Sequence, residues 1–221
     1  MRKLNSGIYM MMLLVLMSCG TSVKVTDAWQ ADDIDEAREE QYLVIARVDD
    51  QAGRQRFEQE IAERLRAGGV KAVESYRQYP SLNILLQLTE EEIDRWIAGI
   101  QNEGFNGIVL TVIKDATSET RTSSSGVGVG VGHYPGYYGD YGYFGDYFGS
   151  VYSHYGYSGA YIPVSQRTYT SETYQLESVA YDLERERNKQ LIAVVTVEIT
   201  DPKSAAEVAP KYADKVFAQF E

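Results

Sequence analysis

Apolar residues in the first half of the chain form short runs that alternate with amphipathic stretches. Residues 42–48 (YLVIARV) and 108–113 (IVLTVI) are continuous apolar runs, typical of strands that are buried on both faces. Residues 70–76 (VKAVESY) predict a further strand between them. We interpret 42–48 as the first and central strand of a sheet.

The segment after residue 48 predicts an amphipathic helix. Phe57, Ile61 and Leu65 recur at four-residue spacing, which places them on one helical face. Asp50 is a candidate N-cap, and Gly68-Gly69 provides the C-terminal stop. Capping therefore explains Asp50 better than a catalytic carboxylate pair with its neighbour.

A second helix is predicted before residues 108–113. It begins at Thr89-Glu90-Glu91-Glu92, which has the pattern of a capping box, and ends at Gly104. Ile93, Ile97 and Ile100 give this helix one apolar face. The order of elements therefore predicts helices that cover a mixed sheet.

The C-terminal part continues the same pattern. Residues 168–183 and 191–200 predict an antiparallel hairpin, and the last segment has an apolar stripe that predicts a final helix, kinked or started at Pro210. We predict one α/β domain over 42–221, with a mixed sheet of about five strands flanked by about three helices.

The N-terminus has the pattern of a lipoprotein signal. Arg2 and Lys3 precede an apolar run that is too short to span a bilayer, and residues 1–18 are therefore predicted to be a signal peptide. The run ends in Ser18-Cys19-Gly20, which resembles the lipobox of bacterial lipoproteins. That resemblance implies cleavage before Cys19 and attachment of a diacylglycerol and an N-acyl chain such as palmitate there.

Lipidation at Cys19 has consequences for location. Two or three acyl chains anchor a protein stably, whereas one chain binds only marginally. Residue 20 is glycine and not aspartate, which by family resemblance favours the outer membrane, with the domain on its periplasmic face. Residues 19–41 are polar and acidic, and we predict that they are a linker between lipid and domain.

Charge limits the partners. Without residues 1–18, 19 basic side chains remain against 32 acidic ones, so nucleic acid is not expected as a partner. The single cysteine is assigned to lipid, so no internal disulfide is expected. The remaining partners are the membrane, reached through the anchor, an envelope protein or glycan, and further copies of the chain.

Residues 126–162 differ from the rest of the chain. They contain 11 Gly, 10 Tyr and 2 Phe, with few aliphatic side chains, which predicts a low-complexity insertion between strands. We expect the domain to stay folded when this insertion is removed. Tyrosines on a glycine-rich backbone suit adaptable contacts, so the candidate contact surface is Tyr134, Tyr137, Tyr138, Tyr141, Tyr143, Tyr147, Tyr152, Tyr155 and Tyr157. A tolerated insertion without function is the alternative.

Sequence motifs for chemistry are not evident. Gly126–Gly132 lacks the spacing of a dinucleotide loop, and His133 and His154 form only a weak metal pattern. We therefore predict no catalytic, cofactor-binding or metal-binding residues.

The chain contains the runs VIARVDDQAGRQRFEQEIAERLRAGGVKAVESY and GFNGIVLTVIKD, the Tyr/Gly insertion, and the pair AYDLERERNKQLIA and ITDP. Together these features resemble an uncharacterised group of small bacterial periplasmic lipoproteins. The element order is also similar to the α/β domain of the periplasmic protein TolB and of the curli secretion lipoprotein CsgG. The resemblance implies a fold and no activity.

Three classes of function follow. The first is a non-enzymatic binding or assembly module of the cell envelope, which uses the insertion as its contact surface. The second is an oligomeric secretion or pore component similar to CsgG, with 126–162 as a membrane hairpin. The third is a hydrolase whose site has no recognisable motif.

Overall fold

The computed structural model describes residues 21–83, 88–121, 141–150 and 169–219. Within these residues, six strands form one sheet: β1 (Ser22–Gln30), β2 (Gln41–Arg47), β3 (Lys71–Glu74), β4 (Gly107–Arg121), β5 (Tyr169–Asp182) and β6 (Leu191–Thr200). The helical elements are η2 (Ile34–Glu39), α2 (Gln51–Ala67), α3 (Ser75–Gln78), α4 (Glu90–Asn102), α5 (Phe144–Ser150), η5 (Arg187–Lys189) and α6 (Ala205–Phe217).

The sheet is mixed, with the strand order β1-β6-β5-β4-β2-β3. Strand β2 is parallel to β3 and to β4, and all other neighbours are antiparallel. The predicted α/β class and the hairpin of β5 and β6 are therefore confirmed. Strand β2 is neither first nor central, because it lies beside the edge strand β3 and follows β1.

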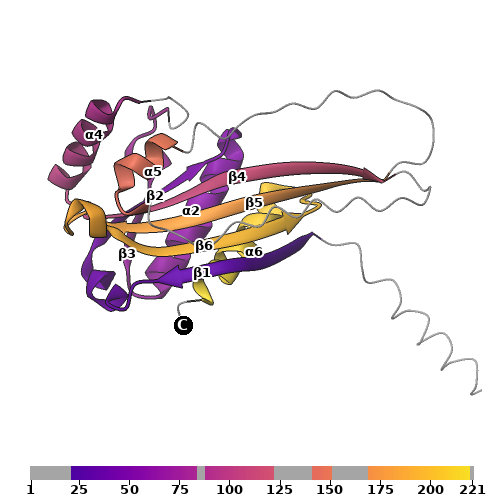
Figure 1. Cartoon of the computed structure of the whole chain (residues 1–221), viewed down its shortest axis with the longest axis horizontal. Helices are drawn as coiled ribbons and strands as arrows, with labels where there is room; N and C mark the ends of the chain where they lie inside the picture. The colour runs from indigo at the N-terminus through magenta and orange to yellow at the C-terminus, as the bar shows by residue number, and fades with distance from the viewer. Residues whose placement is uncertain (1–20, 84–87, 122–140, 151–168, 220–221) are drawn as a thin grey trace, which may run out of the picture.

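Helices cover both faces of the sheet (Figure 1). On one face, α2 packs against α6, and the rings of Phe57 and Tyr212 lie 5.4 Å apart. On the other face, α4 buries Ile93, Ile97 and Ile100, and α5 lies beside it. The chain thus forms two apolar cores, one on each side of the strands.

The predicted ends of α2 and α4 are confirmed, whereas a start of the last helix at Pro210 is not. The Asp50 carboxylate accepts a hydrogen bond from the Gly53 amide at 2.6 Å, and Thr89 and Glu92 form the capping box. Gly104 has a φ of 90°, the left-handed conformation expected after a helix. Pro210 lies inside α6, which runs without interruption from Ala205 to Phe217.

The predicted linker over residues 19–41 is wrong for its described part. Residues 22–30 form the edge strand β1, which pairs with β6, and a 3-10 helix follows over 34–39. Val23 and Val25 pack against the α2/α6 core. A β-bulge between Val25 and Asp27 shifts the alternation, so the strand pattern is short and is easily read as polar linker.

Strand β4 begins at a glycine that a larger residue cannot replace without strain. A Cβ at Gly107 would lie 2.5 Å from the ring of Tyr42. That ring is fixed, because the Tyr42 hydroxyl donates to the Ala37 carbonyl at 3.0 Å and the side chain is 4% exposed. We expect Gly107→Ala to lower the free energy of unfolding by about 1–3 kcal/mol, measured by urea denaturation.

Gly99→Ala is the matched control. Gly99 lies inside α4, and nothing lies within 4 Å of a Cβ placed there. Alanine should therefore stabilise the helix by about 0.5–1 kcal/mol. If both substitutions shifted stability in the same direction, the close contact between Gly107 and Tyr42 would be contradicted.

Candidate functional site

Helix α5 lies within the Tyr/Gly insertion and packs against the sheet. Its aromatic side chains meet Trp96 of α4 and Tyr181 of β5, and ring centroids of Phe144 and Tyr181 are 5.4 Å apart. We call the following residues the α5 cluster: Tyr143, Phe144, Tyr147 and Phe148, which are all at most 8% exposed. The middle of the insertion is thus part of the α4/α5 core.

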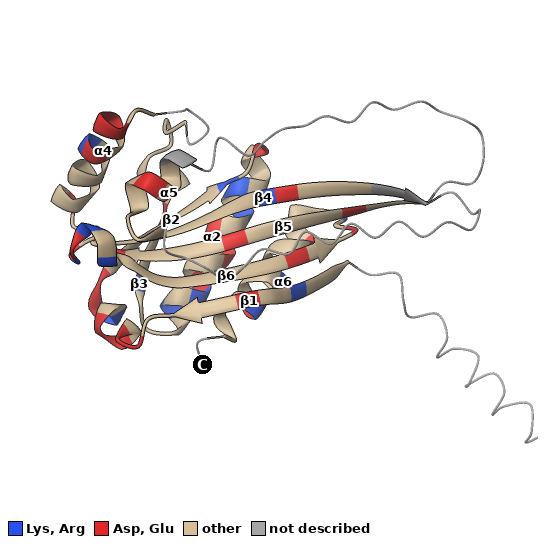
Figure 2. Cartoon of the chain, in the orientation of Figure 1, with Lys and Arg blue, Asp and Glu red and all other residues tan. Residues whose placement is uncertain are grey.

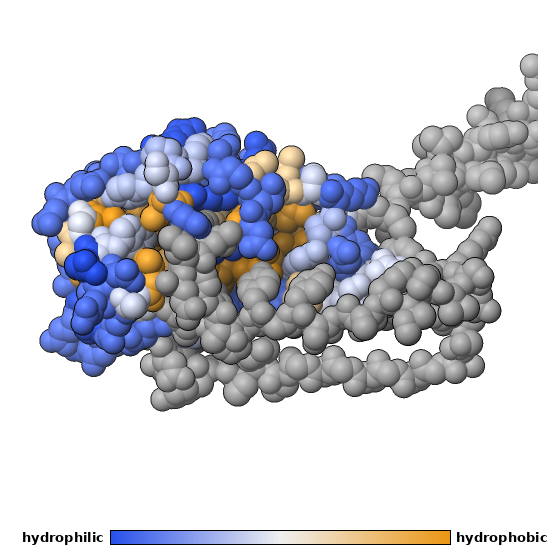
Figure 3. Space-filling view, turned by 90° about the horizontal axis from the view of Figure 1, so that it is seen from above, coloured by the Kyte–Doolittle hydropathy of each residue, from blue (hydrophilic) through white to orange (hydrophobic). Residues whose placement is uncertain are grey.

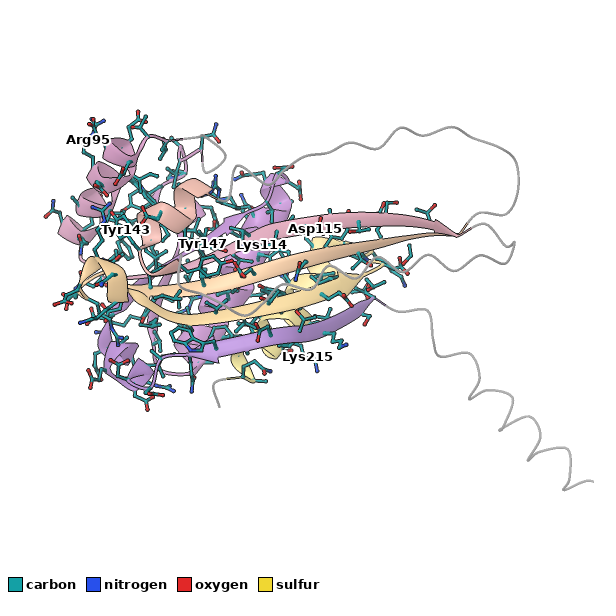
Figure 4. All side chains as sticks on the ribbon, in the orientation of Figure 1. Arg95, Lys114, Asp115, Tyr143, Tyr147 and Lys215 are labelled. Atoms are coloured by element: carbon teal, nitrogen blue, oxygen red, sulfur yellow. The ribbon has the colours of Figure 1, made fainter. Side chains whose placement is uncertain are left out.

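Polar contacts position α5 as well. The Tyr147 hydroxyl donates to Oε1 of Glu177 on β5 at 2.5 Å, and Nζ of Lys114 lies 3.2 Å from the same oxygen. Lys114 also donates to the Tyr141 hydroxyl at 2.8 Å. Figure 4 shows Lys114 and Tyr147 close together, near the middle of β4 and β5. A buried carboxylate therefore joins the insertion to both strands.

The ionisation of this group follows from its burial. Burial raises the pKa of Tyr147 well above its usual value, and the charge of Glu177 raises it further. Burial alone would lower the pKa of Lys114, but the charge of Glu177 and the hydrogen bond to Tyr141 outweigh it, so that pKa is raised. At neutral pH Tyr147 therefore remains a phenol that donates and Lys114 remains a cation.

The ends of α5 have their own partners. The guanidinium of Arg47 donates to the Phe148 carbonyl at 2.8 Å and lies over the Phe148 ring. The Tyr143 hydroxyl donates to Asp94 of α4, and Arg187 stacks on the Tyr143 ring at 3.8 Å. Arg187 and Asp94 also form an ion pair at 3.6 Å. Both ends of α5 are therefore connected to the body.

The tyrosines proposed as a contact surface do not form one set. Tyr143 and Tyr147 are buried, so their assignment to an exposed surface is wrong, and Tyr141 is half-buried. These side chains stabilise the fold by burying large apolar rings while their hydroxyls keep partners. Tyr134, Tyr137, Tyr138, Tyr152, Tyr155 and Tyr157 lie outside the described residues.

Strands β4 and β5 extend beyond the rest of the sheet. One row of paired residues crosses four strands and consists of Ser22 of β1, Thr200 of β6, Thr173 of β5 and Thr117 of β4. Beyond this row, β4 and β5 pair only with each other, from Ser118–Glu172 to Arg121–Tyr169. We call these four pairs the hairpin arm, which is visible to the right in Figure 1.

Asp201 fixes the base of the hairpin arm. Its carboxylate accepts hydrogen bonds from the Glu172 amide and the Ser171 hydroxyl, both at 3.0 Å. Its carbonyl accepts a hydrogen bond from the Thr21 hydroxyl, also at 3.0 Å. The start of the described chain and the hairpin arm are thus joined at the same end of the sheet.

The surface around this site has both polar and apolar areas. Charged residues of both signs lie along the strands in the part of the sheet beyond α5 (Figure 2). Seen from above, apolar side chains reach the surface on both sides of the atoms drawn in grey, and hydrophilic ones lie along the outer edges (Figure 3).

Within the described residues, no group of three or more His, Cys, Asp or Glu side chains has the arrangement of a metal site. In the same part of the chain, no helix has the length and apolarity needed to cross a membrane. Cys19, His133 and His154 lie outside it.

Lys114, Glu177 and Asp201 were not singled out from the sequence. Lys114 directly follows an apolar run, and Glu177 lies between Leu176 and the short run Ser178-Val179-Ala180, so each is a charge next to buried positions. This pattern points to each residue separately, but it does not show that the two side chains contact each other.

No protein-family model matches the chain, and no curated protein matches it. Among solved structures, the chain is similar to PelC from Paraburkholderia phytofirmans, crystallised as a dodecamer, with a TM-score of 0.41, 11% identity, and coverage of 90% of this chain and 96% of PelC. A single-residue variant of that dodecamer has a TM-score of 0.41, 11% identity and coverage of 89% and 96%.

A DUF4136 family protein from Bacteroides thetaiotaomicron has a TM-score of 0.39 and 10% identity, with coverage of 92% of this chain and 97% of that protein. At this level of similarity, no statement about the function or assembly of this chain follows.

Proposed function

We propose that this protein is a lipid-anchored, non-enzymatic assembly module of the bacterial cell envelope, whose tyrosine-rich insertion contacts an envelope protein at the membrane surface. The single observation that carries this proposal is that the start of β1 and the hairpin arm lie at the same end of the sheet. The start of β1, three residues after the proposed lipid site, and the strand ends that lead into the insertion therefore lie at one end of the body.

Distances along the chain support this placement. Cys19 is three residues before Ser22, so at most about 11 Å separates the two Cα atoms. The hairpin arm extends four residues beyond the level of Ser22, which is about 14 Å in an antiparallel strand. With lipid on Cys19, the end of the hairpin arm reaches the level of the membrane surface.

Helix α5 supports a working role for the insertion. Its burial fixes the middle of the insertion to the body, while β4 and β5 fix the two ends. Residues 122–140 and 151–168 each connect the hairpin arm with α5. A tolerated insertion would not need a helix with three buried aromatic side chains, preceded by a fourth, at its centre.

Tyrosine suits the proposed contact. Its ring buries a large area at the cost of ordering only two side-chain torsions, and its hydroxyl adds a polar contact. The two connecting segments contain Tyr134, Tyr137, Tyr138, Tyr152, Tyr155, Tyr157 and Tyr161. We propose that these residues supply the contact surface that Tyr143 and Tyr147 do not.

Photo-crosslinking in cells tests this function. A benzophenone amino acid is placed at Tyr137 or Tyr155 in the full-length lipidated chain, and at Arg95 as a control. Arg95 is exposed on α4, at the end of the body away from the hairpin arm (Figure 4). We expect the same envelope protein to be captured from Tyr137 and Tyr155 and not from Arg95.

A second variant replaces the remaining tyrosines of 122–140 and 151–168 with serine, so that both segments keep their length. Crosslinking from Tyr137 and Tyr155 is then measured again. Loss of the adduct in this variant supports a tyrosine contact. Equal capture from Arg95, or no protein adduct from any position, contradicts the proposal. Adducts with lipid alone, together with ring-shaped oligomers in detergent, indicate the pore component instead.

A further inference from the structure

The α2/α6 face of the sheet contains an apolar cavity of about 300 Å³, separate from the α5 cluster and the hairpin arm. Its floor is the C-terminal part of β5 and the first half of β6, and its walls are η2 and the C-terminal ends of α2 and α6. This volume lies at the lower end of the range of small-molecule pockets.

Small side chains create the cavity. Ala180 and Ala193 lie directly opposite each other on β5 and β6, and Ser178 lies two residues from Ala180 on the same face. Ala37 of η2 and Gly68, after α2, also line the space. These short side chains leave a gap between the sheet and the two helices, whereas other small residues of the same core, such as Ala62 and Ala213, do not line it.

The wall on the η2 side is held in place. The Tyr42 hydroxyl donates to the Ala37 carbonyl, so η2 is attached to the sheet at the cavity. Ala37 is 1% exposed and belongs to the core. Helical and strand elements therefore border the gap, and η2 is fixed to the sheet beside it.

The charged residues at the cavity have one sign. Among the described residues that line it, the two charged ones are Arg38 and Arg64. Their nearest partners are exposed carboxylates, Asp35 at 2.7 Å and Asp214 at 2.6 Å. Arg64 also lies 3.9 Å from the buried carboxylate of Glu60. Ion pairs in this exposed setting are weak, so a ligand carboxylate can take their place and accept hydrogen bonds from a guanidinium fork.

We propose that this cavity binds a single-chain carboxylic amphiphile, with the hydrocarbon chain between the sheet and the two helices and the carboxylate at Arg38 and Arg64. This site is independent of the proposed assembly function, because it uses the opposite face of the sheet.

Isothermal titration of the chain from residue 20 onward with dodecanoate, below its micelle concentration, tests the site. We expect saturable binding of one molecule per chain. Ala180→Leu places a larger side chain in the cavity and should weaken binding by at least about tenfold, with a cooperative melt showing that the variant is folded. Ala193→Leu serves as the second filling variant if Ala180→Leu does not fold.

The headgroup is tested separately with Arg38→Gln and Arg64→Gln combined. This variant should bind dodecanoate about tenfold more weakly and bind dodecanol as the unchanged protein does, since only the carboxylate needs a guanidinium. Absence of saturable binding, or unchanged affinity in both filling variants, overturns the proposal. Equal affinity of the arginine variant for dodecanoate overturns the assignment of the carboxylate.

Discussion

Replacing Phe144 with alanine is expected to lower the free energy of unfolding by about 3–5 kcal/mol, the range for a large aromatic side chain lost from a core. Phe144 is 0% exposed and contacts Trp96 and Tyr181 from inside the Tyr/Gly insertion. Urea denaturation of the chain from residue 20 onward measures the change. The sequence alone predicts that residues 126–162 can be removed without unfolding the domain. A large loss of stability in Phe144→Ala supports a structural role for α5 and argues against that prediction.

Asp146→Ala is the control for this experiment. Asp146 lies on the same helix, two residues from Phe144, and its side chain is exposed. Its replacement should change stability by less than about 0.5 kcal/mol. If Phe144→Ala were as mild as Asp146→Ala, α5 would not be part of the folded body.

The second large effect is expected at Glu58. This side chain is 0% exposed, and its carboxylate accepts hydrogen bonds from Nε of Arg54 at 2.9 Å, Oγ of Ser75 at 2.7 Å and the Tyr76 amide at 2.8 Å. Glu58→Leu leaves the guanidinium of Arg54 buried without its carboxylate. We expect a loss of about 3–5 kcal/mol in the free energy of unfolding.

Two variants show whether this loss comes from the uncompensated charge. Glu63→Gln changes an exposed carboxylate on the same helix and should have an effect below about 0.5 kcal/mol. Arg54→Met combined with Glu58→Leu removes both charges and should recover part of the stability. No recovery in the double variant would mean that the backbone contacts of Glu58, and not its charge, dominate.

The sequence predicts most of the regular elements because their signals are local. The four-residue spacing of Phe57 and Ile61, the capping box at Thr89 and the glycine at 104 are confirmed as the face, start and end of two helices. The strands β2, β4 and β6 each contain a continuous apolar run, and such runs are buried whatever the topology.

The elements that sequence reasoning missed depend on contacts between distant parts of the chain. Strand β1 is stabilised by its pairing with β6, about 170 residues further along the chain. Helix α5 has seven residues, too few for stability by itself, and forms because the sheet buries its rings. Composition indicated low complexity there, but the spacing of Phe144 and Phe148 by four residues was the available helical signal.

The polar parts of the site could not be predicted for a similar reason. Lys114 and Glu177 are 63 positions apart, and only the pairing of β4 with β5 places them beside Tyr147. Likewise, Thr21 and the hairpin arm lie at the same end of the sheet because of the strand order. A single sequence does not specify that order.

Hydrogen exchange followed by mass spectrometry tests the central claim, that the tyrosine-rich insertion is fixed to the body through α5. Peptides that cover residues 141–150 are compared with peptides from β5 and from residues 122–140. The account predicts that amides of α5 exchange slowly in the unchanged protein and that Phe144→Ala accelerates them. Exchange of residues 141–150 as fast as that of an unstructured peptide in the unchanged protein would contradict it.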